Sequence, residues 1–197
     1  MKKVFFITAM IAVSLFVKAQ KAHVELGLKA GLNVASLSYA NNNSSVDSRI
    51  SFNVGGLAHI HLSKEFALQP ELLFSGQGAT QTISGVNHNI NLNYLQIPVL
   101  LQYMAGTGFR LETGPQFGAL VGANSEVGNV KVDTKDAYKT MDVAWVFGAG
   151  YLTNTGLGID ARYNLGLANI NDASSNKFYN RVFSVGIFYQ FKPVKHG

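Results

Sequence analysis

The segment VELGLKAGLNV, residues 24–34, decides the fold of this chain. Every second residue from Val24 to Val34 is apolar, and the residues between them are Glu25, Gly27, Lys29, Gly31 and Asn33. A repeat of two residues is typical of a β-strand with one apolar and one polar face. A water-soluble sheet buries the apolar face, whereas a membrane barrel turns it toward lipid and encloses the polar face. The rest of the chain decides between the two.

The same alternation recurs along the chain, which predicts eight strands in all. These strands span residues 24–34, 50–62, 66–76, 91–104, 109–122, 142–152, 157–168 and 182–191. Each has roughly 10–13 residues, more than the 5–6 residues that are usual in globular sheets, and a length that suits a tilted strand crossing a bilayer. The pattern therefore predicts an all-β fold.

The connections between these segments alternate in length. Short turns at residues 63–65, 105–108 and 153–155 follow the second, fourth and sixth strands, and long polar connections follow the first, third, fifth and seventh. Short periplasmic turns that alternate with longer external loops are typical of outer-membrane barrels. With a periplasmic N-terminus the first connection is external, and here the first connection is long.

Composition and the placement of side chains favour an apolar face that points outward. Charged residues make up 14% of the chain, against about 25% in a typical soluble domain. The polar faces are rich in glycine, which weakens a solvated strand but fits a narrow lumen. Aromatic residues of the apolar faces gather near the short turns, as in an interfacial girdle: Phe66, Tyr103, Phe109, Tyr151, Tyr189 and Phe191. We therefore expect an eight-stranded antiparallel up-and-down transmembrane β-barrel.

The first nineteen residues have the pattern of a secretory signal peptide. Lys2 and Lys3 precede an apolar stretch at 4–17, and a cleavage site of modest residues ends at Ala19. We expect residues 1–19 to be removed and residues 20–197 to form the barrel domain. Loss of Lys2, Lys3 and Lys18 lowers the basic residues from 16 to 13, against 11 acidic ones, so the net charge falls from +5 to +2. Such a weak, scattered charge does not predict nucleic-acid binding.

Three prolines, Pro70, Pro98 and Pro115, fall inside predicted strands. Proline cannot donate a hydrogen bond to a neighbouring strand, and a closed barrel has no edge strand on which to place it. We expect a local bulge at each proline. The alternative is a partly unzipped wall across the third to fifth strands.

Short motifs spread over the chain resemble the PorT-like family of small outer-membrane β-barrels. The matching segments are Gly27-x-Lys29-x-Gly31-x-Asn33, Gln69-Pro70-Glu71-Leu72, Tyr94-Leu95-Gln96-Ile97-Pro98, Gly114-Pro115 and Arg162-Tyr163. The resemblance implies a porin-family barrel in the cell envelope of a Gram-negative bacterium, and it supplies no catalytic residues. Because the founding member of the family is linked to a secretion system, it also implies an alternative role as an accessory subunit of such a machine.

The last predicted strand resembles the signal read by the outer-membrane assembly machinery. Its residues are Ser184, Gly186, Tyr189 and Phe191. The chain departs from the usual signal because residues 192–197 extend past the terminal aromatic residue. The resemblance implies contact with the assembly machinery during biogenesis.

Charged residues on the polar faces are the main candidates for chemistry in the lumen. They are Glu25, Lys29, Glu71, Arg110, Glu112, Asp142, Asp160 and Arg162. They form either a gated pore or a set of paired charges that fills a narrow core, and we expect the second because eight strands leave no open channel. His59 and His61, with Ser63 after them, are candidates for a metal site or a lipid hydrolase. No third metal ligand lies nearby in the sequence, and the short periplasmic turn places these residues far from the outer leaflet, where a lipid hydrolase acts.

The sequence thus predicts a monomeric outer-membrane barrel without enzymatic activity, cofactor or metal. Its expected partners are outer-membrane lipid and the assembly machinery, with no nucleic acid. Its expected role is structural or surface-interacting, with a lumen filled by side chains. Apart from the secretion-machine subunit, a narrow pore for small solutes is the remaining alternative.

Overall fold

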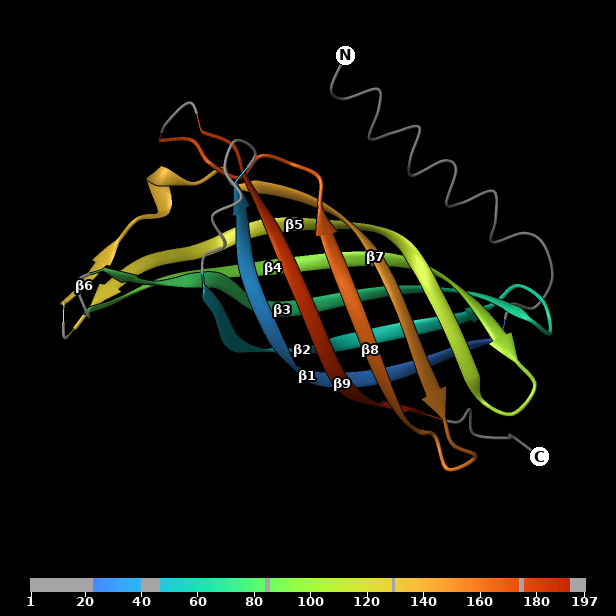
Figure 1. Cartoon of the computed structure of the whole chain (residues 1–197). Helices are drawn as coiled ribbons and strands as arrows, with labels where there is room; N and C mark the ends of the chain where they lie inside the picture. Colours follow the sequence, from blue (N-terminus) through green and yellow to red (C-terminus); the bar gives the residue numbers. More distant parts are fainter. Residues whose placement is uncertain (1–22, 40–46, 84–85, 129, 174–175, 192–197) are drawn as a thin grey trace, which may run out of the picture.

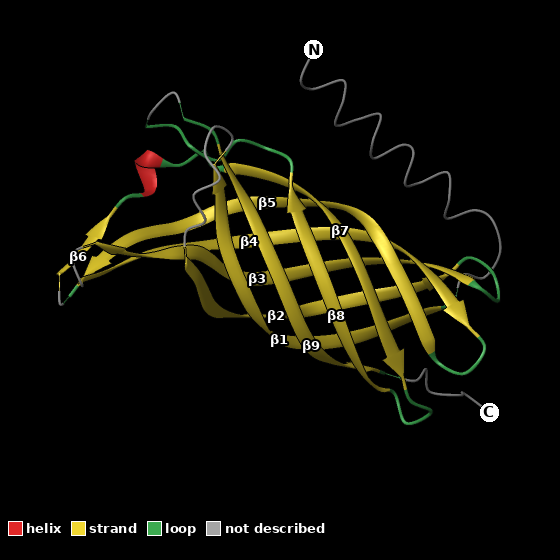
Figure 2. Ribbon diagram, viewed as in Figure 1, coloured by secondary structure: helices red, strands yellow, loops and turns green. Residues whose placement is uncertain are grey.

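The computed structural model describes residues 23–39, 47–83, 86–128, 130–173 and 176–191. The predicted signal peptide lies outside these residues. Among the described residues, no helix is long and apolar enough to cross a membrane. The secondary structure of these residues is almost entirely β-sheet, and their one helix is the short 3-10 helix η1 at Lys135–Ala137 (Figure 2).

Eight long antiparallel strands close into a barrel, as the alternation predicts (Figure 1). Each strand pairs with the next along the chain, β1 also pairs with β9, and the short strand β6 adds to the external end of β5. The strands are β1 (Val24–Tyr39), β2 (Asp47–His61), β3 (Phe66–Ile83), β4 (Val86–Ala105), β5 (Phe109–Val127), β6 (Val130–Asp133), β7 (Met141–Leu152), β8 (Leu157–Gly166) and β9 (Phe178–Gln190).

The barrel has its apolar side chains on the outside. In β1, the side chains of Leu28 and Leu32 are 60% and 61% exposed, whereas Lys29 and Asn33 are only 3% and 2% exposed. A soluble protein of this size does not expose an apolar surface of this extent. Lipid contact explains it, because an apolar surface loses nothing by facing hydrocarbon chains.

The six aromatic residues near the short turns all project from the outer wall. Each is between 42% and 45% exposed. Phe66 and Tyr103 are paired across β3 and β4 with ring centroids 5.4 Å apart, and Phe109 is in register with Tyr151 across β5 and β7. These side chains therefore lie on the outer surface at one end of the barrel, which we term the periplasmic end; the opposite end is the external end.

The prediction of a bulge at each proline is wrong. The register between strands is the same on both sides of each proline, and each proline keeps a partner on one neighbouring strand while the pairing with the other neighbour is interrupted. A missing N–H affects only the side to which it would have pointed, so the ladder on the other side holds the strand in place. The retained pairs are Pro70 with Val99, Pro98 with Gln116, and Pro115 with Trp145.

Register shifts do occur, but toward the external end of the barrel. One lies between Ser48 and Asn53 in β2, and the other lies between Asn93 and Tyr94 in β4. An extra residue on one strand bends that strand and increases its twist. Both shifts lie near the point where the strands extend beyond the closed part of the barrel.

The predicted long loop after the third strand is also wrong. β3 and β4 have 18 and 20 residues and remain paired as far as Ile83 and Val86, so most of that polar segment is β-hairpin. β5 has 19 residues and pairs with β6 beyond the wall. In Figure 1 these ends project past the other strands. We term residues 77–83, 86–92, 122–128 and 130–133 the external arm.

The fluorescence of Trp145, the one tryptophan in the chain, tests the direction of the apolar face. Its side chain is 38% exposed on the outer wall and its indole N–H donates to Thr113 at 2.8 Å. We expect lipids brominated on their acyl chains to quench its emission strongly. As a matched control, Trp145→Phe combined with Phe188→Trp moves the indole to a buried inner position, where quenching falls. Equal quenching at both positions would contradict the inside-out arrangement.

Candidate functional site in the barrel interior

A cluster of charged side chains occupies the middle of the barrel. Arg162 donates to both carboxylate oxygens of Glu71 at 2.7 Å. The same guanidinium binds Glu112, with Nη2 3.2 Å from Oε2, and lies 3.3 Å from Asp160, which is also paired with Lys29. All five side chains are at most 4% exposed. We term Lys29, Glu71, Glu112, Asp160 and Arg162 the central ion cluster.

Glycines in register with the charges let this cluster form. Gly148 lies between Glu112 and Arg162 across β5, β7 and β8. A Cβ atom at Gly148 would lie 2.8 Å from Oε1 of Glu112 and 2.9 Å from Cγ of Arg162. The two long side chains therefore meet over a residue with no side chain of its own, which explains why the polar faces are rich in glycine.

The charges in and next to the central ion cluster balance, with Asp142 left out of this count because it lies near the external end. Lys29, Arg162 and the buried Arg110 carry three positive charges, against three negative charges on Glu71, Glu112 and Asp160. Neutral amides add further bonds: Gln69 donates to Glu71, and Gln102 donates to Glu112, both at 2.7 Å. Buried ions need such partners, because an unpaired charge in a medium of low dielectric is costly.

Two of the eight predicted lumen charges stand apart from this arrangement. Glu25 is partly exposed at the periplasmic end, where its carboxylate lies 3.2 Å from Nε2 of His23. Asp142 is 3% exposed near the external end and accepts a hydrogen bond from Asn180 at 2.8 Å. The other six lie together along the middle and periplasmic part of the lumen.

The histidines of β2 pack against each other. The rings of His59 and His61 are 4.6 Å apart, and Nδ1 of His59 lies 3.2 Å from Oε1 of Gln69. Within the described ranges, no group of three or more His, Cys, Asp or Glu residues is arranged to hold a metal ion. The hydroxyl of Ser63 accepts the backbone N–H groups of Glu65 and Phe66, so it serves the turn.

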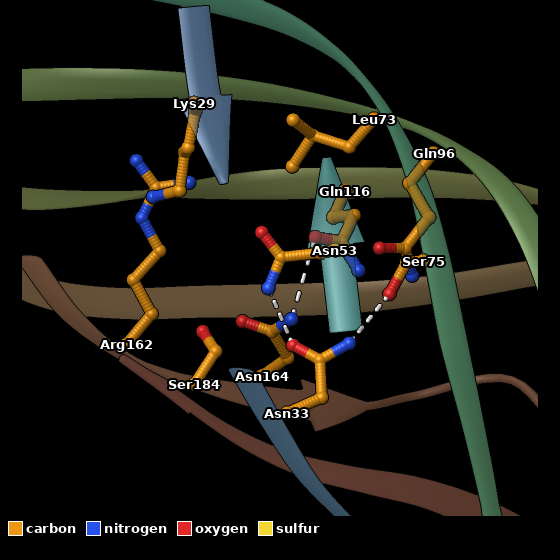
Figure 3. Close-up of a pocket in the computed structure, with 10 residues that line it drawn as sticks. All are labelled: Lys29, Asn33, Asn53, Leu73, Ser75, Gln96, Gln116, Arg162, Asn164 and Ser184. Carbon is orange, nitrogen blue, oxygen red and sulfur yellow. Dashed lines mark hydrogen bonds between the residues drawn. The ribbon is translucent and has the colours of Figure 1, made fainter. Parts of the chain in front are cut away.

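An amide-rich layer lies on the external side of the central ion cluster. Asn33 donates to Ser75 at 3.0 Å and to the carbonyl of Gly76 at 2.8 Å, and Asn53 donates to Asn33 at 2.7 Å. A polar cavity of about 10 Å³ remains here, with Lys29 and Arg162 on one side, as Figure 3 shows. This is space for about one water molecule.

An apolar cluster fills the external end of the lumen. Its seven buried residues come from four strands and a loop: Leu37, Ala79, Leu92, Tyr94, Leu120, Ala123 and Ile170. Backbone bonds fix Ile170 from both sides, because Lys139 donates to its carbonyl at 2.8 Å and its own N–H donates to Phe178 at 2.9 Å. We term these seven residues the outer apolar cluster.

Sequence reasoning missed this cluster, although a signal was present. Leu92 and Leu120 share the inward parity of Gln96 and Gln116, so they break the rule that inward residues are polar. Ile170 lies in the long connection after the seventh predicted strand, which is otherwise polar. Apolar residues at inward positions near the external rim are the feature that predicts such a closure.

The residues of the predicted assembly signal lie on both faces of β9. Ser184 is 6% exposed and faces the lumen, and Gly186 is buried between the strands. Tyr189 is 44% exposed on the outer wall, and its ring centroid is 5.4 Å from that of Phe191, which is 45% exposed. The two aromatic residues thus belong to the outer periplasmic rim.

A family model described as outer membrane protein beta-barrel domain matches residues 18–172. The chain belongs to this family. The protein is therefore an outer-membrane barrel, in agreement with its closed sheet and apolar outer wall. No curated protein matches the sequence.

Solved outer-membrane barrels are similar to this one in fold. The attachment invasion locus protein Ail of Yersinia pestis is 13% identical over 85% of this chain and 98% of its own, with a TM-score of 0.50. Neisserial surface protein A is 13% identical over 86% of this chain and 99% of its own, with a TM-score of 0.57. At this level of identity the likeness concerns the fold alone.

Replacing Arg162 tests the energetics of the central ion cluster. We expect Arg162→Met to lower the free energy of unfolding by about 3–5 kcal/mol, because it leaves buried carboxylates without a cation. Arg181→Met is the matched control: Arg181 donates to the backbone carbonyls of Gly166 and Asn180, so its loss costs less. The free energy of unfolding of both variants is measured by urea titration in lipid vesicles. The folded fraction at each urea concentration is read from the different gel mobilities of the folded and the heat-unfolded barrel. Equal losses would contradict the importance of the cluster.

Proposed function

We propose that this outer-membrane barrel is a non-enzymatic protein with a structural or surface-interaction role, and that side chains fill most of its lumen. The observation that carries the proposal is the central ion cluster, whose guanidinium at Arg162 connects carboxylates from β3, β5 and β8 across the lumen. An eight-stranded barrel is just wide enough for its own side chains. Paired charges that span this width leave no continuous aqueous path.

Two further layers support a filled lumen. The cavity beside Asn53 has a volume of only about 10 Å³, which is too small for a hydrated ion. Toward the outside, the outer apolar cluster covers the lumen, with Leu92 and Ile170 both 0% exposed. An ion would have to cross a charged layer and then an apolar layer. The charged layer fills the width of the lumen, and the apolar layer offers the ion no polar partner.

Planar-bilayer recording of the refolded protein tests this proposal. We expect no steady conductance in molar KCl, because the central ion cluster and the outer apolar cluster both obstruct the lumen. A porin of known conductance, refolded in the same way, is the control for insertion. Steady steps of porin size would contradict the filled lumen, and small regular steps would favour a narrow solute pore instead.

The external arm is the part of the barrel best placed for contact at the cell surface. It is stiffened by side-chain bonds between strands: Thr80 donates to Asn89 at 2.9 Å, and Asn91 donates to Asn124 at 2.8 Å. The amide side chains of Asn89, Asn91 and Asn124 are partly exposed along this surface, and polar groups on external segments are a common basis for recognition. The name of Ail, an attachment invasion locus protein, describes a surface role for that relative. For this chain, the arm supports the surface role.

Cysteine labelling on intact cells tests which end is external. The chain has no cysteine, so each variant carries a single reactive thiol. We expect a membrane-impermeant maleimide to label Lys131→Cys in β6 and not Lys64→Cys in the short turn after β2, although both side chains are exposed. Both variants label after the outer membrane is permeabilised. If only Lys64→Cys were labelled on intact cells, the end that we term periplasmic would be the external one.

The PorT-like assignment and the role in a secretion machine remain a second proposal. They rest on the segment YLQIP at residues 94–98, in which Tyr94, Gln96 and Pro98 are buried inside the barrel. Because these residues are buried, their match to the PorT-like family supports a similar barrel interior more than it supports binding to the same partner. Capture of stoichiometric envelope proteins with the tagged barrel would favour the secretion role, whereas recovery of a monomer would favour the structural or surface role.

A further inference from the structure

Asp142 differs from the other buried carboxylates of the barrel. Glu71, Glu112 and Asp160 each pair with a cationic side chain of the central ion cluster. Asp142 is equally buried, at 3% exposed, yet no lysine or arginine of the described residues forms an ion pair with it. A carboxyl group in this environment becomes neutral by taking a proton or is balanced by a cation close by.

Two other oxygen-bearing side chains lie beside Asp142. Asn180 of β9 donates from Nδ2 to Oδ2 of the carboxylate at 2.8 Å. The ring of Tyr94 and the Cβ of Asp142 both flank Gly118, at 3.4 Å and 3.5 Å from the position that a Cβ would take there. Strands β4, β7 and β9 thus bring three oxygen-bearing side chains into one region of the lumen.

One oxygen of each of these three side chains has no partner. They are Oδ1 of Asp142, Oδ1 of Asn180 and the hydroxyl of Tyr94, which are buried and accept or donate no hydrogen bond within the described residues. Tyr94 is 0% exposed and Asn180 is 3% exposed. Three unpaired buried oxygens in one small region are unusual, because buried polar atoms nearly always find partners.

We propose that Asp142, Asn180 and Tyr94 bind one alkali-metal cation, sodium or potassium, beneath the outer apolar cluster. Carboxylate, amide and hydroxyl oxygens are the donors that hard cations prefer, whereas transition metals favour imidazole and thiolate. A single carboxylate balances a single positive charge, so a monovalent ion leaves the site neutral. The site lies one residue from the external end of β7, which begins at Met141, so the shorter route for the ion is from the external side.

The cation has a structural consequence for the barrel. β4, β7 and β9 are not neighbours in the sheet, so the ion joins strands across the lumen that no ladder connects. It therefore stabilises the external end of the barrel below Leu120 and Ile170. Ligand binding to the folded state raises stability with the free concentration of the ligand.

Unfolding in different salts tests the proposal. The folded protein in zwitterionic vesicles is titrated with urea in NaCl, KCl or N-methylglucamine chloride at equal ionic strength. We expect a higher, saturating urea midpoint in NaCl or KCl, and the ion that acts at lower concentration identifies the preferred cation. Asp142→Asn should lose this dependence, whereas the matched Asp136→Asn, at an exposed position, should keep it.

A second measurement does not depend on the folding of a variant. Thallium-205 NMR of the wild-type protein should show a bound signal that sodium or potassium displaces. Identical midpoints in all three salts, together with no bound thallium, would overturn the proposal and assign a proton to Asp142. A salt effect that Asp142→Asn retains would also overturn it, because the ion would then bind elsewhere.

Discussion

Backbone N–H and C=O groups in a bilayer have no water to bond with, and the rest of this structure follows from that constraint. Among β-structures, only a closed barrel satisfies all of these groups, because an open sheet leaves unpaired groups at its edges. β1 pairs with β9, and β4 pairs with β5 on the opposite side of the wall, so the sheet has no free edge within the barrel. Each of the three prolines keeps a pairing partner on one neighbouring strand, which shows that the closed ladder tolerates local losses.

Closure with eight strands makes the lumen narrow, and a narrow lumen determines its chemistry. Side chains from opposite walls meet, so charged residues find counter-charges and glycines make room for them. Gly148 and Arg162 illustrate both effects, because the guanidinium crosses above a residue without a side chain to reach carboxylates on other strands. The interior is therefore an ordered polar core, in the place where a soluble barrel has an apolar one.

The external end follows a different rule from the middle. There the strands leave the membrane, and side chains on the inner face form the outer apolar cluster instead of another charged layer. Asp142 and Asn180 lie between these two regions, where no cation of the central ion cluster pairs with Asp142 and one oxygen each of Asp142, Asn180 and Tyr94 has no hydrogen-bond partner. The unpaired oxygens thus lie where the lumen changes from charged to apolar.

The alternation of residues is a local property, so the sequence alone determined the eight strands, their antiparallel order and the outward direction of residues such as Leu28 and Ile187. It also determined which charges face inward, since parity along a strand assigns each residue to one face. The pairing of Arg162 with Glu71 depends on the stagger between strands 91 residues apart, and no local pattern encodes that distance. The passage of the ladder past Pro70, the extension of β3 and β4 into the external arm, and the burial of Ile170 were decided only by tertiary structure. In each case the outcome depends on which strand or loop lies opposite, and only closure of the barrel brings these partners together.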